Sequence, residues 1–121
     1  MRIFFLLSAA VAVFAIAGLA QDQAEYSTWM KSVPPTVAAI RMAADNDAAD
    51  AGKLADTFDK VATYWKAKDP AAATLAETAR DAAKAIAGGG DKASNLMKLQ
   101  GTCAGCHSQH REGSAGNFKI K

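Results

Sequence analysis

Alanine is the feature that most limits what this chain can fold into. It supplies 23 of the 101 residues after position 20, and those residues include 44 apolar ones. Alanine is the strongest helix former and is depleted in strands. The composition therefore predicts an all-α protein and argues against a β-sandwich or barrel. Because alanine buries little area, a domain of about 100 residues needs another source of apolar bulk.

The first twenty residues have the pattern of a secretory signal peptide. A short positive start at Met1-Arg2 precedes an apolar run from Ile3 to Ile16, and small residues in Gly18-Leu19-Ala20 form a cleavage site before Gln21. A retained membrane anchor is the alternative, because the apolar stretch is close to the minimum length of a membrane span, which is roughly 17 to 25 residues. No later run is long enough to cross a bilayer. We expect removal of residues 1–20 and export to the periplasm.

The remaining sequence predicts four helices, because apolar residues recur at steps of three and four. The second helix is expected over about 48–66, the third from Asp69-Pro70 to the glycines at 88–90, and the fourth from Asp91 to about Gln109. Short connections make neighbouring helices antiparallel, which predicts an up-down-up-down four-helix bundle. This bundle is expected to fill 21–112, followed by a flexible tail at 113–121.

Two prolines interrupt the first predicted helix. Pro34-Pro35 falls inside an apolar pattern that runs from Tyr26 to Ala44. A proline inside a helix removes a backbone donor and clashes with the preceding turn. We therefore expect either a kink or a break into helices near 23–33 and 35–44.

Charge excludes one class of partner. The last 31 residues carry five basic and two acidic side chains, while the chain as a whole is close to neutral. A nucleic-acid binder would need clustered Lys and Arg in much greater excess. The mild excess favours a solvated face, with docking to an acidic partner as a second interpretation.

The sequence Cys103-Ala-Gly-Cys106-His107 holds both cysteines of the chain. The spacing C-x-x-C-H is typical of covalent haem c attachment. Two thiols one helical turn apart can each bond one vinyl group of a porphyrin, and the following histidine can bind the iron as proximal ligand. We therefore predict one covalent haem c, held by Cys103 and Cys106 and ligated by His107. Its apolar plate would supply the missing core.

Three other interpretations of the two cysteines fit the sequence less well. A thioredoxin-like pair belongs at the start of a helix that follows a strand, whereas this pair lies late in an all-helical sequence. A zinc site of Cys103, Cys106, His107 and His110 would place four ligands on one helix, which cannot surround a metal tetrahedrally. A disulfide between residues this close would stabilise the fold little.

An exported four-helix chain with this motif on its last helix resembles the class II c-type cytochromes, which comprise the cytochrome c′ family and its low-spin, methionine-ligated relatives. Cys103, Cys106 and His107 match the attachment motif, and Arg111 matches a basic position common in the family. His110 stands where the family usually has an aromatic residue, so the chain would be a divergent member. The resemblance implies an electron carrier with redox proteins as partners, and in many members of the family two chains pair through their first two helices. The sequence has no Ser-His-Asp set and no glycine-rich phosphate loop, so enzymatic turnover is not expected.

The sixth iron position has one favoured candidate. In an up-down-up-down bundle the start of the first helix lies beside the end of the fourth, which favours Met30 as the distal ligand. Helical rise puts Met42 and Met97 about 15 Å or more from that level, and His110 is one turn from His107 on the proximal side. The resemblance agrees on Met30. If Met30 leaves the iron open, the alternative function is binding of small gases such as NO or CO. His110 is expected to be exposed or beside the haem edge.

Overall fold

The computed structural model describes residues 2–113 and 119–121, with side chains from residue 22 onward. It contains helices α1 (Arg2–Met42), α2 (Ala48–Lys66), α3 (Pro70–Ala87) and α4 (Lys92–His110), followed by strands β1 (Arg111–Glu112) and β2 (Lys119–Ile120). The predicted all-α, four-helix class is confirmed. The chain divides into two compact units, Met1–Lys31 and Ser32–Lys121, and each is described by itself.

The helix α1 continues through Pro34 and Pro35. The predicted break is therefore wrong, and a kink stays a prediction. The physical reason is that the fixed φ of proline suits a helix, while its cost lies in the missing donor and the ring contacts. The two rings remove the amides that would bond the carbonyls of Met30 and Lys31. The next carbonyl along the helix, that of Ser32, accepts a hydrogen bond from the Thr36 hydroxyl over 2.8 Å.

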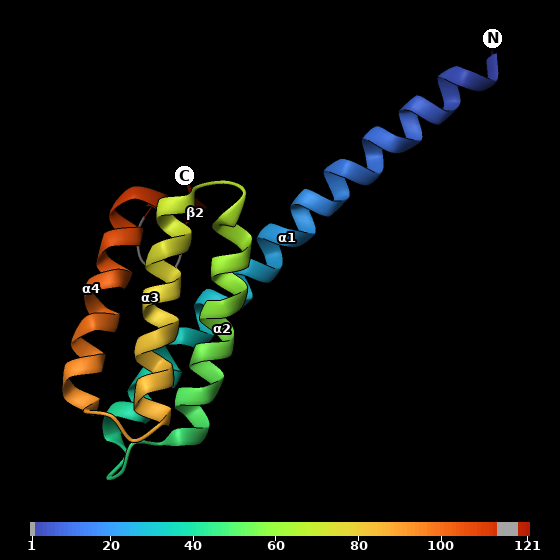
Figure 1. Cartoon of the computed structure of the whole chain (residues 1–121). Coiled ribbons are helices and arrows are strands. Elements are labelled where there is room, and N and C mark those ends of the chain that lie inside the picture. The colour runs from blue at the N-terminus through green and yellow to red at the C-terminus, as the bar shows by residue number, and fades with distance from the viewer. Residues whose placement is uncertain (1, 114–118) are drawn as a thin grey trace. The chain divides into compact units, whose positions relative to one another are not determined.

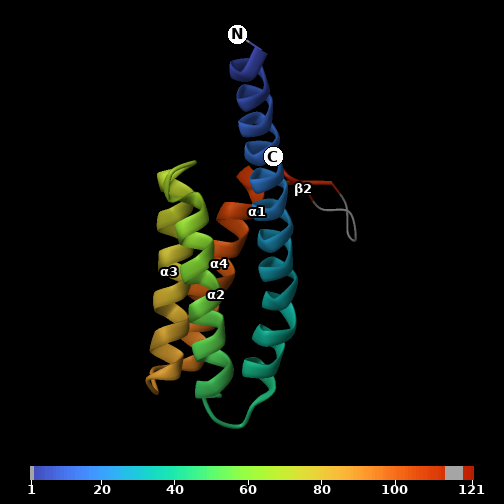
Figure 2. The ribbon, with the colours of Figure 1, turned by 90° about the vertical axis from the view of Figure 1, so that its right-hand side faces the viewer.

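Side-chain caps explain where α2, α3 and α4 begin. Asp47, Asp69 and Asp91 each accept a hydrogen bond from a backbone amide of the first helical turn that follows. Such caps satisfy amides that have no partner within the helix. Proline follows Asp69 at the first helical position, as predicted. The boundaries predicted for α2 and for the start of α3 are confirmed. The three helices run side by side in both ribbon views (Figures 1 and 2).

One end of the second unit is closed by side chains that bond backbone carbonyls. The Lys92 ammonium donates to the carbonyls of Ile40, Ala43 and Asp45 over 3.1, 2.6 and 2.7 Å. The Asn46 amide donates to the carbonyls of Ile86 and Gly90 over 3.0 and 2.7 Å. The α1–α2 turn and the α3–α4 turn therefore lie together at this end.

The core is built mainly from small side chains. Among the described residues, nine of the 18 buried apolar ones are alanines. The largest fully buried side chains are Ile40, Leu54 and Ile86, which lie close in sequence to the α1–α2 and α3–α4 turns. The first three turns of α3 instead bury only alanines, namely Ala72, Ala73, Ala76 and Ala79. Other large buried side chains follow the length of the bundle, namely Phe58, Val61 and Trp65 on α2 and Leu96 and Leu99 on α4.

A short antiparallel ribbon follows α4. Arg111 pairs with Ile120 and Glu112 with Lys119, and the Lys121 amide donates to the His110 carbonyl over 3.0 Å. The predicted tail at 113–121 therefore includes a paired strand, while residues 114–118 lie outside the described part. Figure 2 shows β2 from the side.

The predicted signal peptide at 1–20 lies in the stretch whose side chains are outside the described residues. In the part of the chain that was searched, no helix has the length and apolar character needed to cross a membrane.

Candidate functional site

The two cysteines lie on the core-facing side of α4. Leu96 and Leu99 are buried on this helix, and Cys103 and Cys106 continue the same spacing of three and four residues, which keeps all four on one helical face. Both thiols are free and half-buried. His107 follows at the edge of this face and is also half-buried. The predicted attachment residues are thus brought together on the last two turns of α4.

The motif lies beside the part of α3 that buries only alanines. A Cβ added to Gly105 would meet the two Leu75 methyl groups at 3.8 and 3.9 Å, which is ordinary contact. This places the middle of the motif next to Leu75, within the α3 segment that holds Ala72, Ala73 and Ala76. The side chains that α3 buries beside the motif are therefore small, while the larger Leu75 is only half-buried there.

The end of α4 is tied to the α2–α3 turn by His110. Its ring Nε2 lies 2.8 Å from Asp69 Oδ2, and its ring centroid lies 4.4 Å from that of Trp65, at an interplanar angle of 39°. The His110 side chain is only 17% exposed, so the prediction that it is solvent-exposed is wrong. The alternative prediction, that it lies beside the haem edge, stays a prediction. Sequence reasoning missed the bond to Asp69. The spacing of four residues from Cys106 to His110 indicates a shared, partly buried face but does not identify the partner of His110.

The Asp69 carboxylate contacts both α3 and α4. Its Oδ1 accepts the Ala71 amide over 3.0 Å and caps α3, while its Oδ2 binds His110. Partial burial alone would raise the Asp69 pKa, but the hydrogen bonds from His110 and from the amides of Ala71 and Ala72 together lower it. The ionised carboxylate is therefore the form that joins α3 to the end of α4.

This lowered pKa predicts a pH-dependent loss of stability. Because the Asp69 pKa is lower in the fold than its ordinary value of 3.8, its contribution is complete above that value and is lost as the pH falls through the folded pKa. An Asp69→Asn variant keeps a good helix cap but loses the charge. We expect its urea midpoint to lie below that of the parent at pH 7 and the difference to shrink on acidification below about pH 4.

Asp56→Asn, at an exposed position on α2, is the matched control for this measurement and should follow the parent curve at every pH. A constant difference between Asp69→Asn and the parent from pH 7 to about pH 3 would show that the carboxylate charge has no role.

The pKa shifts of the motif disfavour thiol exchange and leave His107 able to bind a metal. Burial raises the pKa of Cys103, and burial together with the nearby Cys103 and Asp69 raises that of Cys106. At neutral pH both are thiols, whereas an exchange-active pair carries a thiolate. Burial, with a smaller effect of Arg111, lowers the pKa of His107. Its imidazole is therefore neutral at pH 7, which is the form that binds metals.

Met30, the predicted distal ligand, lies on α1 in the unit Met1–Lys31. The attachment motif lies in the other unit, so the role of Met30 stays a prediction. In the same unit, the rings of Tyr26 and Trp29 meet edge to face, with centroids 6.3 Å apart. The excluded methionines, Met42 and Met97, are 86% and 74% exposed. Their side chains face solvent.

Among residues 22–113 and 119–121, no three His, Cys, Asp or Glu side chains form a group that would hold a metal ion on their own. Comparison with protein-family models, with curated proteins and with solved structures finds no match for this chain.

Proposed function

We propose that this chain is an exported, monohaem c-type cytochrome that carries electrons between redox proteins. One observation supports this most directly: two free thiols and a neutral imidazole lie together on the core-facing side of α4, opposite an α3 segment that buries only alanines. The donor set fits haem c, because two thiols one turn apart match the two vinyl groups and the next residue is an imidazole. The alanines that α3 buries near the motif suit a broad, flat cofactor.

Each residue of the motif has a separate role in this proposal. Cys103 and Cys106 hold the cofactor through thioether bonds, so that it cannot dissociate. His107 binds the iron from the proximal side and, because its pKa is lowered, offers an unprotonated nitrogen at neutral pH. When bound, the haem supplies a centre that accepts and donates one electron. Met30 is the proposed distal ligand, and a thioether at that position raises the reduction potential.

The bond from His110 to Asp69 supports the geometry of the attachment site. It fixes the turn of α4 directly after His107 to the start of α3. A fixed helix end reduces the rotamer and backbone freedom of the ligand that it carries.

The test is the optical spectrum of the protein produced by export in a host that attaches haem c. We expect oxidised and reduced haem bands, and we expect the haem to stay with the polypeptide after denaturation, since thioether bonds survive unfolding. Serine at Cys103 and Cys106 should abolish this retention. A purified protein without haem bands, or one that releases its haem on denaturation, would refute the proposal.

A further inference from the structure

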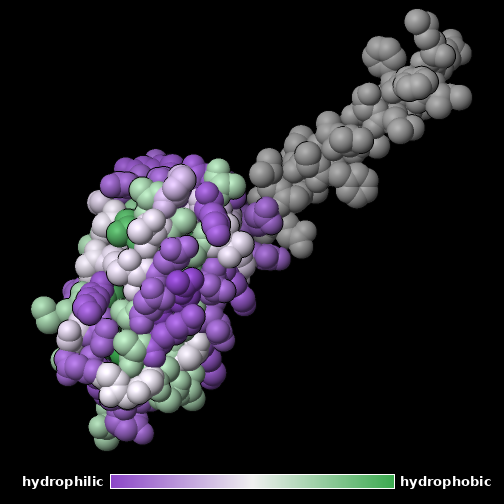
Figure 3. All heavy atoms as spheres, in the orientation of Figure 1, coloured by the Kyte–Doolittle hydropathy of each residue, from purple (hydrophilic) through white to green (hydrophobic). Residues whose placement is uncertain are grey.

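Five basic side chains gather where α2 and α4 end. The Trp65–His110 ring contact and the His110–Asp69 bond hold these two helix ends together. The ribbon joins the same place, because the Lys121 amide donates to the His110 carbonyl. The basic end is defined by the exposed residues Lys66, Lys68, Arg111, Lys119 and Lys121. Figure 3 shows hydrophilic residues over this upper part of the second unit.

Two acidic side chains lie at the basic end, against five basic ones. Asp69 binds His110 over 2.8 Å, and Glu112 is the backbone register partner of Lys119 in the ribbon. The Lys68 ammonium donates to the Tyr64 carbonyl over 3.1 Å and lies 3.9 Å from the centre of the Tyr64 ring. These contacts fix the position of the Lys68 charge. The basic end therefore carries a net positive charge.

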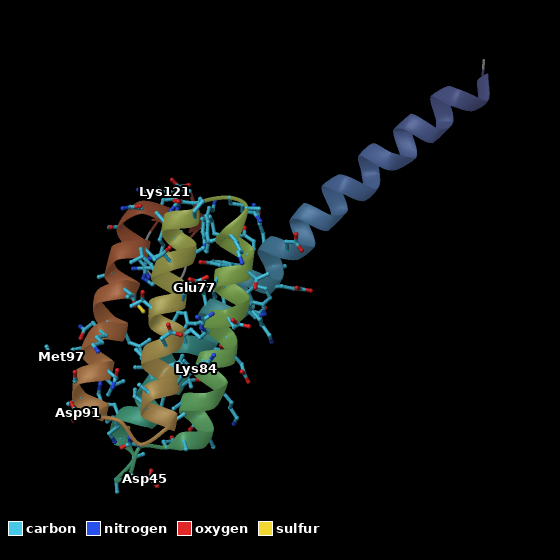
Figure 4. All side chains as sticks on the ribbon, viewed as in Figure 1. Asp45, Glu77, Lys84, Asp91, Met97 and Lys121 are labelled. Carbon is cyan, nitrogen blue, oxygen red and sulfur yellow. The ribbon has the colours of Figure 1, made fainter. Side chains whose placement is uncertain are left out.

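The opposite end of the second unit has the opposite character. The connecting turns hold three aspartates and the first turn of α2 holds a fourth, Asp50. The three in the connecting turns accept backbone amides at the starts of α2 and α4 or within the α1–α2 turn. The Lys92 ammonium at this end is held by three backbone carbonyls. We call this the acidic end, with Asp45, Asp47, Asp50 and Asp91. Figure 4 labels Asp45 and Asp91 at one end of the bundle and Lys121 at the other.

The basic end lies directly beside the attachment motif. The Arg111 amide donates to the His107 carbonyl, so the basic end begins immediately after the proposed proximal ligand. Charges of one sign at one end of a small protein orient it during encounter and raise association rates with an oppositely charged partner. A partner attracted to the basic end would meet the molecule next to Cys106 and His107.

We propose that the basic end is the docking surface for the acidic face of a protein redox partner. The inference rests on the proposed electron-carrier function and specifies the partner's chemistry, which is a cluster of exposed carboxylates. Such docking brings the partner to the motif-bearing turns of α4 and turns the acidic end away from it. An acidic protein face is the proposed partner because its negative charge complements the positive charge of the basic end.

The test compares two variants with the same net charge. Lys119→Glu/Lys121→Glu alters the basic end, while Lys53→Glu/Lys84→Glu alters exposed positions on α2 and α3 outside it. One electron passes from the reduced haem protein to hexacyanoferrate(III), an anion, or to tris(phenanthroline)cobalt(III), a cation. At low ionic strength we expect the basic-end variant to react about tenfold more slowly with the anion and faster with the cation. The matched variant should change each rate less than about twofold, and salt should remove the differences.

A second measurement does not depend on haem. Immobilised poly-L-glutamate should retain the parent and the matched variant at low salt and release the basic-end variant. Equal effects of the two variants in both assays would overturn the docking proposal. Stronger retention of the parent on phosphatidylglycerol vesicles than on poly-L-glutamate would also overturn it, in favour of a membrane surface. A chain without haem would refute the proposed function, while the poly-L-glutamate comparison would still decide the charge preference.

Discussion

The double variant Cys103→Ser/Cys106→Ser is expected to lose its cooperative unfolding transition. Half of the buried apolar residues in the described part of the chain are alanines, and the first three turns of α3, beside the motif, bury only alanines. Without a covalent haem, α3 therefore offers the motif a buried surface of small side chains, with Leu75 only partly buried there. A domain of about 100 residues has little stability to spare when part of its core is missing.

The expected product is a molten state. Far-ultraviolet circular dichroism should keep most of the helical signal, because α2, α3 and α4 retain their caps. Near-ultraviolet circular dichroism of Trp65 should collapse, and a hydrophobic dye should bind. The parent sequence produced without haem is the matched control. It should behave like the double variant, which separates loss of the cofactor from the effect of serine. Near-native cooperative unfolding of either haem-free protein would contradict the prediction.

Local rules predicted the middle of the fold well. The bounds of α2 and the start of α3 follow from the apolar spacing of the sequence and from Asp69-Pro70, where a capping carboxylate and a fixed φ act within a few residues. Leu54, Phe58, Val61 and Trp65 are all buried, as their spacing requires. These features depend on residues close together in sequence, so a single sequence is sufficient to find them.

Contacts between distant residues were the part that local reasoning missed. The bond from His110 to Asp69 joins residues 41 positions apart, and nothing in either local sequence favours this partner over another. The strand at Lys119–Ile120 depends in the same way on pairing with β1. At Pro34-Pro35 the error had another cause. The local rule gives the cost of a proline in a helix, but whether the helix continues depends on the total free energy of the element.

The candidate site also has a part that local sequence predicts and a part that depends on distant contacts. Cys103, Cys106 and His107 are neighbours in sequence, so their helical register fixes that they lie on adjacent faces of α4. Met30 is far from them along the chain, and its role rests on the expected bundle topology and on the resemblance. The motif is therefore the better supported part of the proposed haem site, and Met30 requires the more decisive experiment.

The variant Met30→Ala is expected to convert a closed iron site to an open one. If Met30 binds the iron, its removal frees the sixth position, and the reduced protein should then bind CO rapidly where the parent does not. Loss of a thioether ligand should also lower the reduction potential, by on the order of 0.1 V, within the range of about 0.8 V that axial ligands can set. Spectra of the oxidised, reduced and CO-treated protein, with a redox titration, measure both effects.

Met42→Ala and Met97→Ala are the matched controls, because both side chains are largely exposed and should leave the spectrum and potential unchanged. The same experiment decides between the two functions that the motif allows. Rapid CO binding by the parent, with no spectral change in Met30→Ala, would contradict methionine ligation and favour the gas-binding alternative. A closed parent site that opens only in Met30→Ala supports electron transfer, because a filled sixth position keeps small ligands from the iron while electrons still pass.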